Sequence, residues 1–221
     1  MSTPPDRSLT GLLVDYGGVL TNPLADTYLD FCAGEDIDPG EFRGLIRELA
    51  RASDDPGSAN LVHALERGEL SPADFEHRLA GRLLTRAGLP VPADGLLDRM
   101  FSAFRVEAAM VAAVGELHRT GIRTALVSNS WTLDYPRDGW SELFDAVVIS
   151  GEVGMRKPEP DIYQHAAAEL GLDPAACGFV DDLAENVRGA VAVGMVGVLH
   201  RAVPATVSEL QALFGRPYER P

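Results

Sequence analysis

The sequence predicts an α/β fold in which a parallel sheet is interrupted, after its first strand, by an all-helical domain. Three observations lead to this prediction. A short apolar run, residues 12–14, ends at Asp15 and two glycines. Residues 24 to about 106 carry helical periodicity, with turn signals between the segments. After residue 106, apolar runs alternate with helical segments, which is typical of a parallel sheet.

The composition is that of a globular chain with room for one large domain or a domain with an insertion. The chain has 221 residues, 46% of them hydrophobic, and a net charge of −14. This acidic balance argues against a surface that binds the backbone of nucleic acids. The local basic run of Arg43, Arg47 and Arg51 has helical spacing and is interpreted as a solvated helix face.

The cysteines and the N-terminus predict a soluble, cytoplasmic protein. Cys32 and Cys177 lack the spacing of metal ligands and are interpreted as reduced thiols. The first ten residues have no apolar signal-peptide core, and no run reaches membrane-spanning length. We therefore expect no membrane partner.

The first strand is predicted over residues 11–15. Leu12, Leu13 and Val14 form a buried apolar run. Gly17 and Gly18 then turn the chain sharply, because glycine adopts either hand at low cost. Asp15 therefore lies at the carboxyl end of a central strand, where open α/β sheets bind their ligands.

Residues 23–105 are predicted to form the helical domain. Turn signals lie at residues 36–40, 54–57 and 90–92. One helix is predicted to begin with Ser71 as its N-cap and Pro72 at its first position. Its apolar face is expected to comprise Phe75, Leu79, Leu83 and Leu84. Gly88 is expected to end the helix.

Residues 1–22 and 106–221 are predicted to form the α/β core. Further strands are expected at 123–127, 144–149, 177–180 and 195–200. Helices are expected at 107–119, 161–170 and 184–193, with a last one at 205–214 as a cover. Because strands and helices alternate, we expect a parallel sheet with right-handed crossovers.

Polar side chains follow the predicted strands or open the predicted helices at four places. They are Asp15, Ser128 with Asn129, Lys157, and Asp181 with Asp182. Each alone has an ordinary role as a turn former, a helix cap or an exposed charge. Since the carboxyl ends of parallel strands share one edge, their joint occurrence predicts that these groups converge on one site.

The converging groups suit chemistry at phosphorus. Three carboxylates close together repel each other, and a hard divalent cation relieves that repulsion. Mg²⁺ prefers one or two carboxylates together with water and phosphate oxygens. Ser128, Asn129 and Lys157 offer donors to a phosphate, and Asp15 offers a nucleophile. The pattern predicts a Mg²⁺-assisted phosphoryl reaction.

Over nearly its whole length the chain resembles the haloacid dehalogenase (HAD) superfamily of phosphohydrolases. The matching segments are VDYGGVLTNP (14–23), LVSNSW (126–131), GMRKPEPDIYQHAAAELGL (154–172) and GFVDDLAENVRGAVAVGM (178–195). It is most similar to the subgroup with a helical, C1-type cap. That subgroup includes α-glucose-1-phosphate phosphatase-like proteins, which LERGELSPADFEHRL (65–79) also resembles, and the N-terminal phosphatase domain of soluble epoxide hydrolases. The resemblance implies a Rossmann-like HAD core, a helical cap and a phosphoric monoester hydrolase.

The resemblance also implies a role for each site residue. Asp15 is implied to be the nucleophile that forms an aspartyl-phosphate. The implied Mg²⁺ ligands are the Asp15 carboxylate, the Gly17 carbonyl and Asp182, with Asp181 binding through water or orienting its neighbours. The remaining implied roles are phosphate binding by Ser128, Asn129 and Lys157, and support of the metal shell by Asn186.

One position departs from the family pattern. The superfamily usually has a second Asp two positions after the nucleophile, where this chain has Gly17. That Asp protonates the leaving group and then activates water, and such groups contribute about 10²–10⁴-fold. The substitution fits a phosphatase for good leaving groups such as sugar 1-phosphates or acyl phosphates, as some relatives with glycine here indicate. It also fits replacement of the acid by Asp26 or Asp134, or a binding or regulatory protein without turnover.

Two other classes use similar groups. A receiver domain carries its acid pair after the first strand, whereas here Asp181 and Asp182 follow a later one. A 2-haloacid dehalogenase shares the fold without Mg²⁺ and needs no such pair. Both rank behind a phosphatase for a small phosphorylated metabolite, with a sugar phosphate as one candidate.

The choice of substrate is expected to lie in the cap. Trp131 and Trp140 follow the second motif and are interpreted as contacts for a substrate or a partner. The sequence leaves open a monomer or a homodimer. It also leaves open whether the basic cap side chains face substrate or solvent; these are Arg43, Arg47, His63, Arg67 and His77.

Overall fold

The computed structural model describes residues 9–50, 60–132 and 134–215. The predicted turn at 54–57, Arg51 and residues 1–8 of the N-terminus lie outside these ranges. Within them the predicted α/β fold is confirmed, and every predicted core strand and helix is present with ends shifted by at most two residues.

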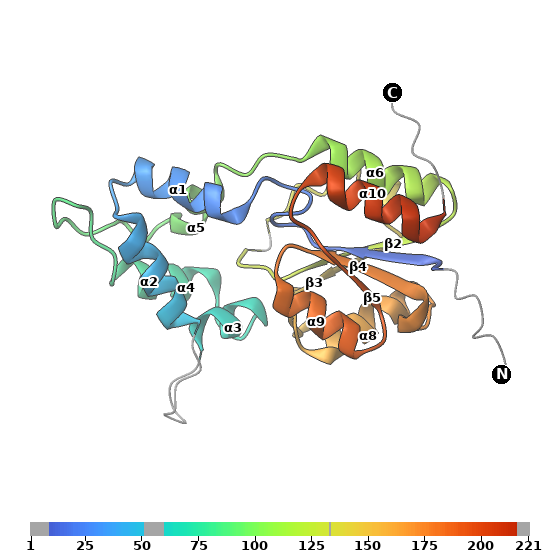
Figure 1. The fold of residues 1–221 in the computed structure, drawn as a ribbon. Coiled ribbons are helices and arrows are strands. Elements are labelled where there is room, and N and C mark those ends of the chain that lie inside the picture. Colours follow the sequence, from blue (N-terminus) through green and yellow to red (C-terminus); the bar gives the residue numbers. More distant parts are fainter. Residues whose placement is uncertain (1–8, 51–59, 133, 216–221) are drawn as a thin grey trace.

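A five-stranded parallel sheet forms the core, in the order β3-β2-β1-β4-β5 (Figure 1). The strands are β1 (Gly11–Val14), β2 (Arg123–Ser128), β3 (Ala146–Ile149), β4 (Cys177–Asp181) and β5 (Val196–Leu199). In the central strand, Leu12 is in register with Thr124 of β2 and Gly178 of β4. Because the strand order reverses between β1 and β4, their carboxyl ends flank the crevice where such sheets bind ligands.

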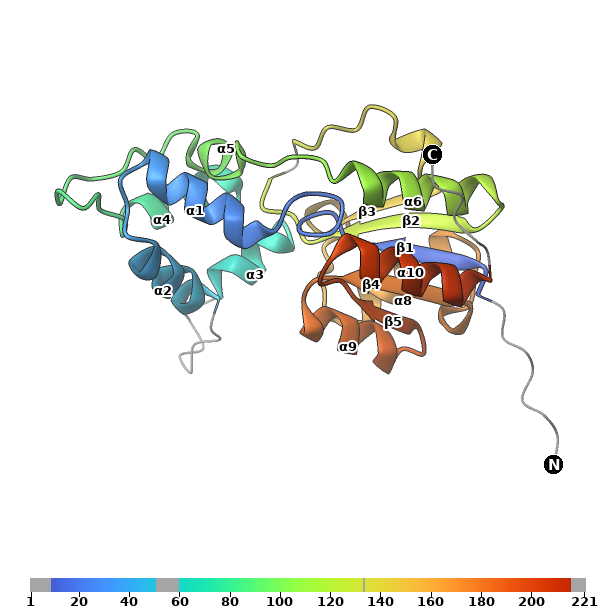
Figure 2. The ribbon, with the colours of Figure 1, turned by 45° about the horizontal axis from the view of Figure 1, so that its top comes forward.

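Helices cover both faces of the sheet (Figures 1 and 2). On one face lie α6 (Ala108–Arg119) and α10 (Val203–Phe214), and on the other α8 (Pro160–Glu169) and α9 (Ala184–Ala192). Successive side chains of β1 point to opposite faces, so Leu12 and Val14 join the first layer and Leu13 the second. The uninterrupted apolar run before Asp15 reflects this burial on both faces.

The inserted helices form a separate layer beside the core (Figure 2). They are α1 (Leu24–Gly34), α2 (Pro39–Leu49), α3 (Leu61–Glu66), α4 (Pro72–Ala80) and α5 (Leu96–Phe101). Their apolar faces meet in a hydrophobic cluster of their own, centred on Phe42, Phe75 and Leu96. We call residues 23–105 the cap.

Two segments that run side by side connect the cap to the core. Thr21 and Val106 form an isolated antiparallel bridge. Beside it, the Asn22 amide donates to the Arg105 carbonyl over 3.0 Å, and the Arg105 amide donates to Oδ1 of Asn22 over 2.7 Å. We propose the domain boundaries at 22/23 and 105/106 on this double crossing.

The helix predicted from Ser71 to Gly88 is shorter than expected, and that prediction is wrong beyond Ala80. Oγ of Ser71 caps α4 by accepting from the Asp74 amide, but the helix ends before Gly81. Leu84 is 53% exposed and forms an isolated bridge with Pro90. The prediction extended too far because Leu83 continues the apolar spacing of the helix, although it is buried in a non-helical segment.

Three short elements were not predicted from the sequence. They are α7 (Ser150–Val153) and the 3₁₀ turns Trp140–Glu142 and Pro174–Ala176. Among the described residues, no helix has the length and apolar character needed to cross a bilayer.

Candidate active site

Asp15 lies directly beyond β1, at the crevice between the sheet and the cap. Its backbone amide donates to the Val180 carbonyl of β4, which keeps the residue at the edge of the sheet. Its side chain is 10% exposed, and Oδ1 accepts a hydrogen bond from the Tyr16 amide over 2.7 Å. The other face of the carboxylate opens to a pocket.

Lys157 connects two of the carboxylates. Its Nζ lies 2.6 Å from Oδ1 of Asp15 and 2.8 Å from Oδ2 of Asp181. The side chain is 1% exposed and passes over the ring of Phe179. Asn129 holds the Lys157 backbone from both sides, accepting from its amide over 2.8 Å and donating to its carbonyl over 3.0 Å.

Asp15, Asp181 and Asp182 bring carboxylate oxygens within 4.8 Å of one another. Asp181 is fully buried, and protein donors occupy both of its oxygens: Lys157, the Leu183 amide and Nδ2 of Asn186. Asp182 is only partly buried and lines the pocket. The two adjacent acids are therefore not equivalent, since Asp182 is the one with oxygens open to a ligand.

The cluster holds more negative charge than one lysine balances. Burial raises the pKa of Asp15 to about 8, Lys157 opposes this, and Asp181 and Asp182 add to the rise. Burial and the charge of Asp181 raise the pKa of Asp182 to about 6. Burial lowers the pKa of Lys157, but its two carboxylate partners raise it above its ordinary value, so the amine stays protonated. All-oxygen ligands with surplus negative charge fit a hard divalent cation such as Mg²⁺.

The two glycines after Asp15 meet different surroundings. Gly18 has φ +78°, and a Cβ there would lie 2.6 Å from Oδ2 of Asp182, so only glycine lets that carboxylate approach the loop. Gly17 has no such constraint. A Cβ there would have Phe104 Cζ as its nearest contact, at 3.9 Å.

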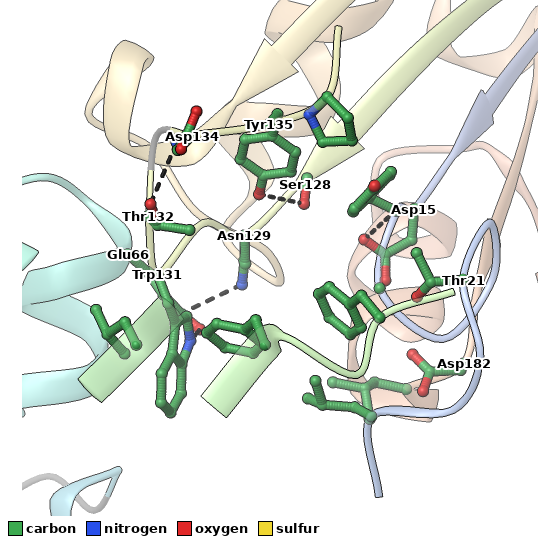
Figure 3. Close-up of a pocket in the computed structure, with 18 of the residues that line it drawn as sticks. Asp15, Thr21, Glu66, Ser128, Asn129, Trp131, Thr132, Asp134, Tyr135 and Asp182 are labelled. Carbon is green, nitrogen blue, oxygen red and sulfur yellow. Dashed lines mark hydrogen bonds between the residues drawn. The ribbon is translucent and has the colours of Figure 1, made fainter. Parts of the chain in front are cut away.

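Ser128 ends β2 and points at the same crevice. Its Oγ lies 2.9 Å from the hydroxyl of Tyr135, which also lines the pocket (Figure 3). Burial raises the pKa of Tyr135 to about 12, so the phenol keeps its proton at neutral pH. Tyr135 could not be recognised from the sequence, because a lone tyrosine seven residues beyond Ser128 carries no spacing signal.

Glu66 is a second residue that the sequence analysis missed. This cap carboxylate accepts from Nε of Arg156 over 2.6 Å, from Nε1 of Trp131 over 3.2 Å and from Nδ2 of Asn129 over 3.4 Å. Three core side chains thus converge on one cap residue, next to Lys157. Its position at the end of a short cap helix gives no sequence pattern that indicates this contact.

These groups line a pocket of about 430 Å³ between the cap and the core (Figure 3). Of the predicted site residues, Asp181 lies beneath the pocket wall, and the other seven line it: Asp15, Gly17, Ser128, Asn129, Lys157, Asp182 and Asn186. Asp134 also lines the pocket, whereas Asp26 is exposed on α1 and does not.

Of the two tryptophans predicted to contact a substrate or a partner, one lines the pocket and the other lies in the core. Trp131 lines the pocket and packs edge-on against Phe75 and Phe101. Trp140 is 9% exposed and packs in the core against Tyr16 and Phe144, so the prediction that it contacts a substrate or partner is wrong. An aromatic side chain near a site in sequence can face either side of its loop.

Comparison with known proteins identifies the family. A family model described as a haloacid dehalogenase-like hydrolase matches residues 9–194, which include all of these residues. The chain belongs to the haloacid dehalogenase-like hydrolases. This confirms the predicted resemblance and sets aside a receiver domain.

Three similar proteins place this HAD-like hydrolase among its relatives. It is 33% identical to the sesquiterpene phosphatase astK of Aspergillus oryzae, over 92% of this chain and 95% of that one. It is 29% identical to rat bifunctional epoxide hydrolase 2, over 59% of this chain but only 26% of the longer relative. A Bacteroides thetaiotaomicron HAD family enzyme solved with magnesium and inorganic phosphate has a TM-score of 0.61 at 21% identity, over 88% and 96% of the two chains, which shows the shared fold.

Proposed function

We propose that this HAD-like hydrolase is a Mg²⁺-dependent phosphatase that hydrolyses a phosphate monoester through Asp15. The observation that carries the proposal is the buried Asp15 carboxylate, open to the pocket beside Lys157, Asp181 and Asp182. The phosphatase name of the fungal relative supports it. So does the magnesium and phosphate complex of the structural neighbour.

Asp15, the Gly17 carbonyl and Asp182 are the groups that we propose for Mg²⁺. Bound there, the cation would neutralise charge on the transferring phosphoryl group. Asp181 has no oxygen free of protein donors, so we propose that it orients Lys157 and Asn186 instead. This choice between the two acids agrees with the more open position of Asp182.

The proposed reaction has two displacement steps. In the first, an oxygen of Asp15 attacks phosphorus, the bond from phosphorus to the ester oxygen breaks, and the leaving oxygen takes a proton from water to become the alcohol. In the second, water attacks phosphorus and releases inorganic phosphate and the Asp15 carboxylate. Lys157 and Ser128 lie beside Asp15 and would bind the phosphate oxygens, while Asn129 holds the Lys157 backbone.

The missing acid at Gly17 makes a binding protein without turnover the second candidate. Asp134 lines the pocket and remains a possible proton donor, but Asp26 does not reach it. The 2-haloacid dehalogenase alternative gains nothing from the acidic cluster, since an attack on carbon requires no cation. A sugar phosphate substrate, a cytoplasmic location and the oligomeric state stay predictions.

Hydrolysis of p-nitrophenyl phosphate tests the proposal. We expect phosphate release that requires Mg²⁺, is lost with a chelator and falls at least about 10³-fold in Asp15→Asn. Asp26→Asn is the matched control, because it removes an exposed carboxylate outside the pocket. If the intact protein binds Mg²⁺ but releases no phosphate, the binding-protein candidate takes first place.

A further inference from the structure

We infer that the alcohol of the substrate is a hydrophobic chain of isoprenoid size, about ten to fifteen carbons, carried as its monophosphate. The inference rests on the proposed phosphatase function and names the substrate class of that site. It follows from three features of the pocket: an apolar wall, a lining that contains none of the cations of the described part of the cap, and its volume.

The pocket has a polar floor from the core and an apolar wall to which the cap, its connections and the core loops after β1, β2 and β4 contribute. Figure 3 shows Asp15 and Asp182 on one side and Trp131 on the other. Ring contacts make the wall continuous: Phe101 stacks on Phe104 with centroids 5.1 Å apart, and Phe104 meets Tyr16 at 6.2 Å. The wall consists of Tyr16, Leu24, Tyr28, Leu97, Phe101, Phe104, Val106, Trp131, Tyr135, Pro136 and Leu183.

Two members of the wall expose apolar surface where a ligand would cover it. Val106 is 64% exposed and Leu183 is 48% exposed, although large apolar side chains are usually inside. Both belong to the pocket lining, Val106 beside the connection to the cap and Leu183 in the loop after β4. A hydrophobic ligand would cover both at once.

The pocket offers few charged groups to a second phosphate or a nucleotide. Away from the core floor, and apart from Glu66 and the tyrosines, the polar side chains of its described lining are limited to Thr21, Asp98, Thr132 and Asp134. Among the described lining residues Lys157 is the one cation, and Asp15 and Asp181 already engage it. None of the basic cap side chains that the sequence left open, at positions 43, 47, 63, 67 and 77, lines the pocket. The lining carboxylate of Glu66 is occupied by three core donors. Sugar hydroxyls against this wall would lose hydrogen bonds to water without replacement.

The volume limits the length of the chain. A pocket of about 430 Å³ lies at the lower end of the roughly 300–1,000 Å³ that bury most of a drug-sized ligand. This accommodates a phosphate with a ten- to fifteen-carbon chain, and leaves much of the wall uncovered by a five-carbon one. The sesquiterpene phosphatase among the relatives agrees with this class, since a sesquiterpene has fifteen carbons.

A chain-length series tests the inference on the intact protein with Mg²⁺. We would measure kcat/KM for dimethylallyl, geranyl and farnesyl monophosphates below their micellar concentrations, beside glucose 6-phosphate and p-nitrophenyl phosphate. We expect kcat/KM to rise at least about tenfold for each added isoprene unit, because each buried methylene strengthens binding. Glucose 6-phosphate is expected at the bottom of the series.

Substitutions in the wall locate the effect. Phe101→Asn removes an apolar contact to the longer chain. We therefore expect kcat/KM for farnesyl monophosphate, relative to that for dimethylallyl monophosphate, to fall at least about tenfold. Val106→Asn changes an exposed side chain that the fold tolerates, and is expected to lower the same ratio about threefold. Leu89→Asn is the control, because Leu89 is 62% exposed in a cap loop outside the pocket.

Binding to Asp15→Asn separates the failure of this inference from that of the proposed function. A change in the fluorescence of Trp131, which lines the pocket, reports occupancy without turnover, whereas Trp140 lies outside the lining. Hydrolysis of p-nitrophenyl phosphate with no preference for the prenyl series would overturn the substrate class alone. No hydrolysis of any ester, with farnesyl phosphate still bound tighter than glucose 6-phosphate, would overturn the phosphatase and keep the ligand class.

Discussion

Gly17 leaves space for the carboxylate that the superfamily usually carries there. Its φ does not lie in the left-handed region, and a Cβ would make only a 3.9 Å contact with Phe104. We expect Gly17→Asp to fold and to raise kcat on alkyl phosphates at least about tenfold, because it supplies an acid for the leaving oxygen. The measurement is steady-state kinetics on alkyl and aryl esters, with the smaller gain on the aryl ester.

Gly17→Asn is the matched control for that gain. It places an amide of the same size in the same loop but has no proton to donate. Equal kinetics for the Asp and Asn variants would show that general acid catalysis is not what this site lacks.

Gly18, one residue later, is expected not to tolerate a side chain. Gly18→Ala forces a methyl group to within 2.6 Å of the Asp182 carboxylate at φ +78°, so the carboxylate must move and the loop is strained. We expect Mg²⁺ affinity, measured by isothermal titration calorimetry, to fall at least about tenfold. Gly17→Ala, which keeps the Gly17 carbonyl and meets open space, should bind Mg²⁺ as the parent does.

The residues that converge on the site could be predicted because parallel strands end at one edge. Asp15, Ser128 and Asp181 follow neighbouring strands, so topology alone brings them together. The contacts of Glu66 and Tyr135 could not be predicted, because they depend on how the cap and a loop pack against that edge. Apart from the family resemblance, which implied Asp182 as the direct ligand, the sequence could not rank Asp181 and Asp182, since these adjacent residues differ in which donors surround them.

At the scale of the helix, α3 attaches the cap to the core through a buried ion pair. The side chains of Glu66 and Arg156 are 9% and 8% exposed. We expect Glu66→Ala to lower the free energy of unfolding by about 3–5 kcal/mol, because it removes the buried partner of Arg156 and leaves only the more distant Glu159, at 4.0 Å. Urea unfolding followed by fluorescence measures the change.

An exposed pair beside the same helix is the control for that loss. Glu69, paired with Arg67 at 2.9 Å, is 57% exposed, and such surface pairs contribute at most about 1 kcal/mol. If Glu69→Ala were as destabilising as Glu66→Ala, burial would not be the cause.

His63 makes α3 sensitive to acid. Burial, with the charges of Arg156 and Arg67, lowers the pKa of His63 to about 4, so the folded state favours the neutral ring. Stability from this group is fully present above the unfolded pKa of about 6.5 and is lost as the pH falls towards 4. We expect His63→Gln to lose less stability between pH 7 and pH 4.5 than the parent, measured by urea unfolding. His77→Gln, at an exposed position of α4, should behave as the parent does.

The end of α4 shows where element prediction failed. Ser71 and Pro72 marked its start correctly, because a cap acts through neighbouring backbone amides. Its end depended on tertiary structure: Leu83 reaches the cap cluster from a loop and so continues the apolar pattern of a helix that has stopped. Capping residues therefore predict where a helix begins, whereas apolar spacing alone does not show where it ends.

At the scale of the molecule, cap and core have separate hydrophobic clusters, and the polar site lies between them. The parallel sheet could be predicted from the alternation of strands and helices, and the structure adds the strand order. The shape of the pocket could not be predicted from the sequence, because its wall combines α1, α5, both connections and the loops after β2 and β4. We therefore propose that substrate choice depends on how the two components are arranged around the pocket.

Mg²⁺ is expected to stabilise the whole molecule, because the site has more negative charge than Lys157 balances. A ligand that binds only the folded state at a hundred times its Kd adds about 2.7 kcal/mol, or roughly 5–10 °C in Tm for a chain of this size. Differential scanning calorimetry with Mg²⁺ and with a chelator measures the shift. Since the net charge is −14, NaCl at matched ionic strength must be run to separate general screening from site binding. Asp182→Asn should abolish the Mg²⁺-specific part of the shift, and a shift that persists in that variant would place the cation elsewhere on the acidic surface.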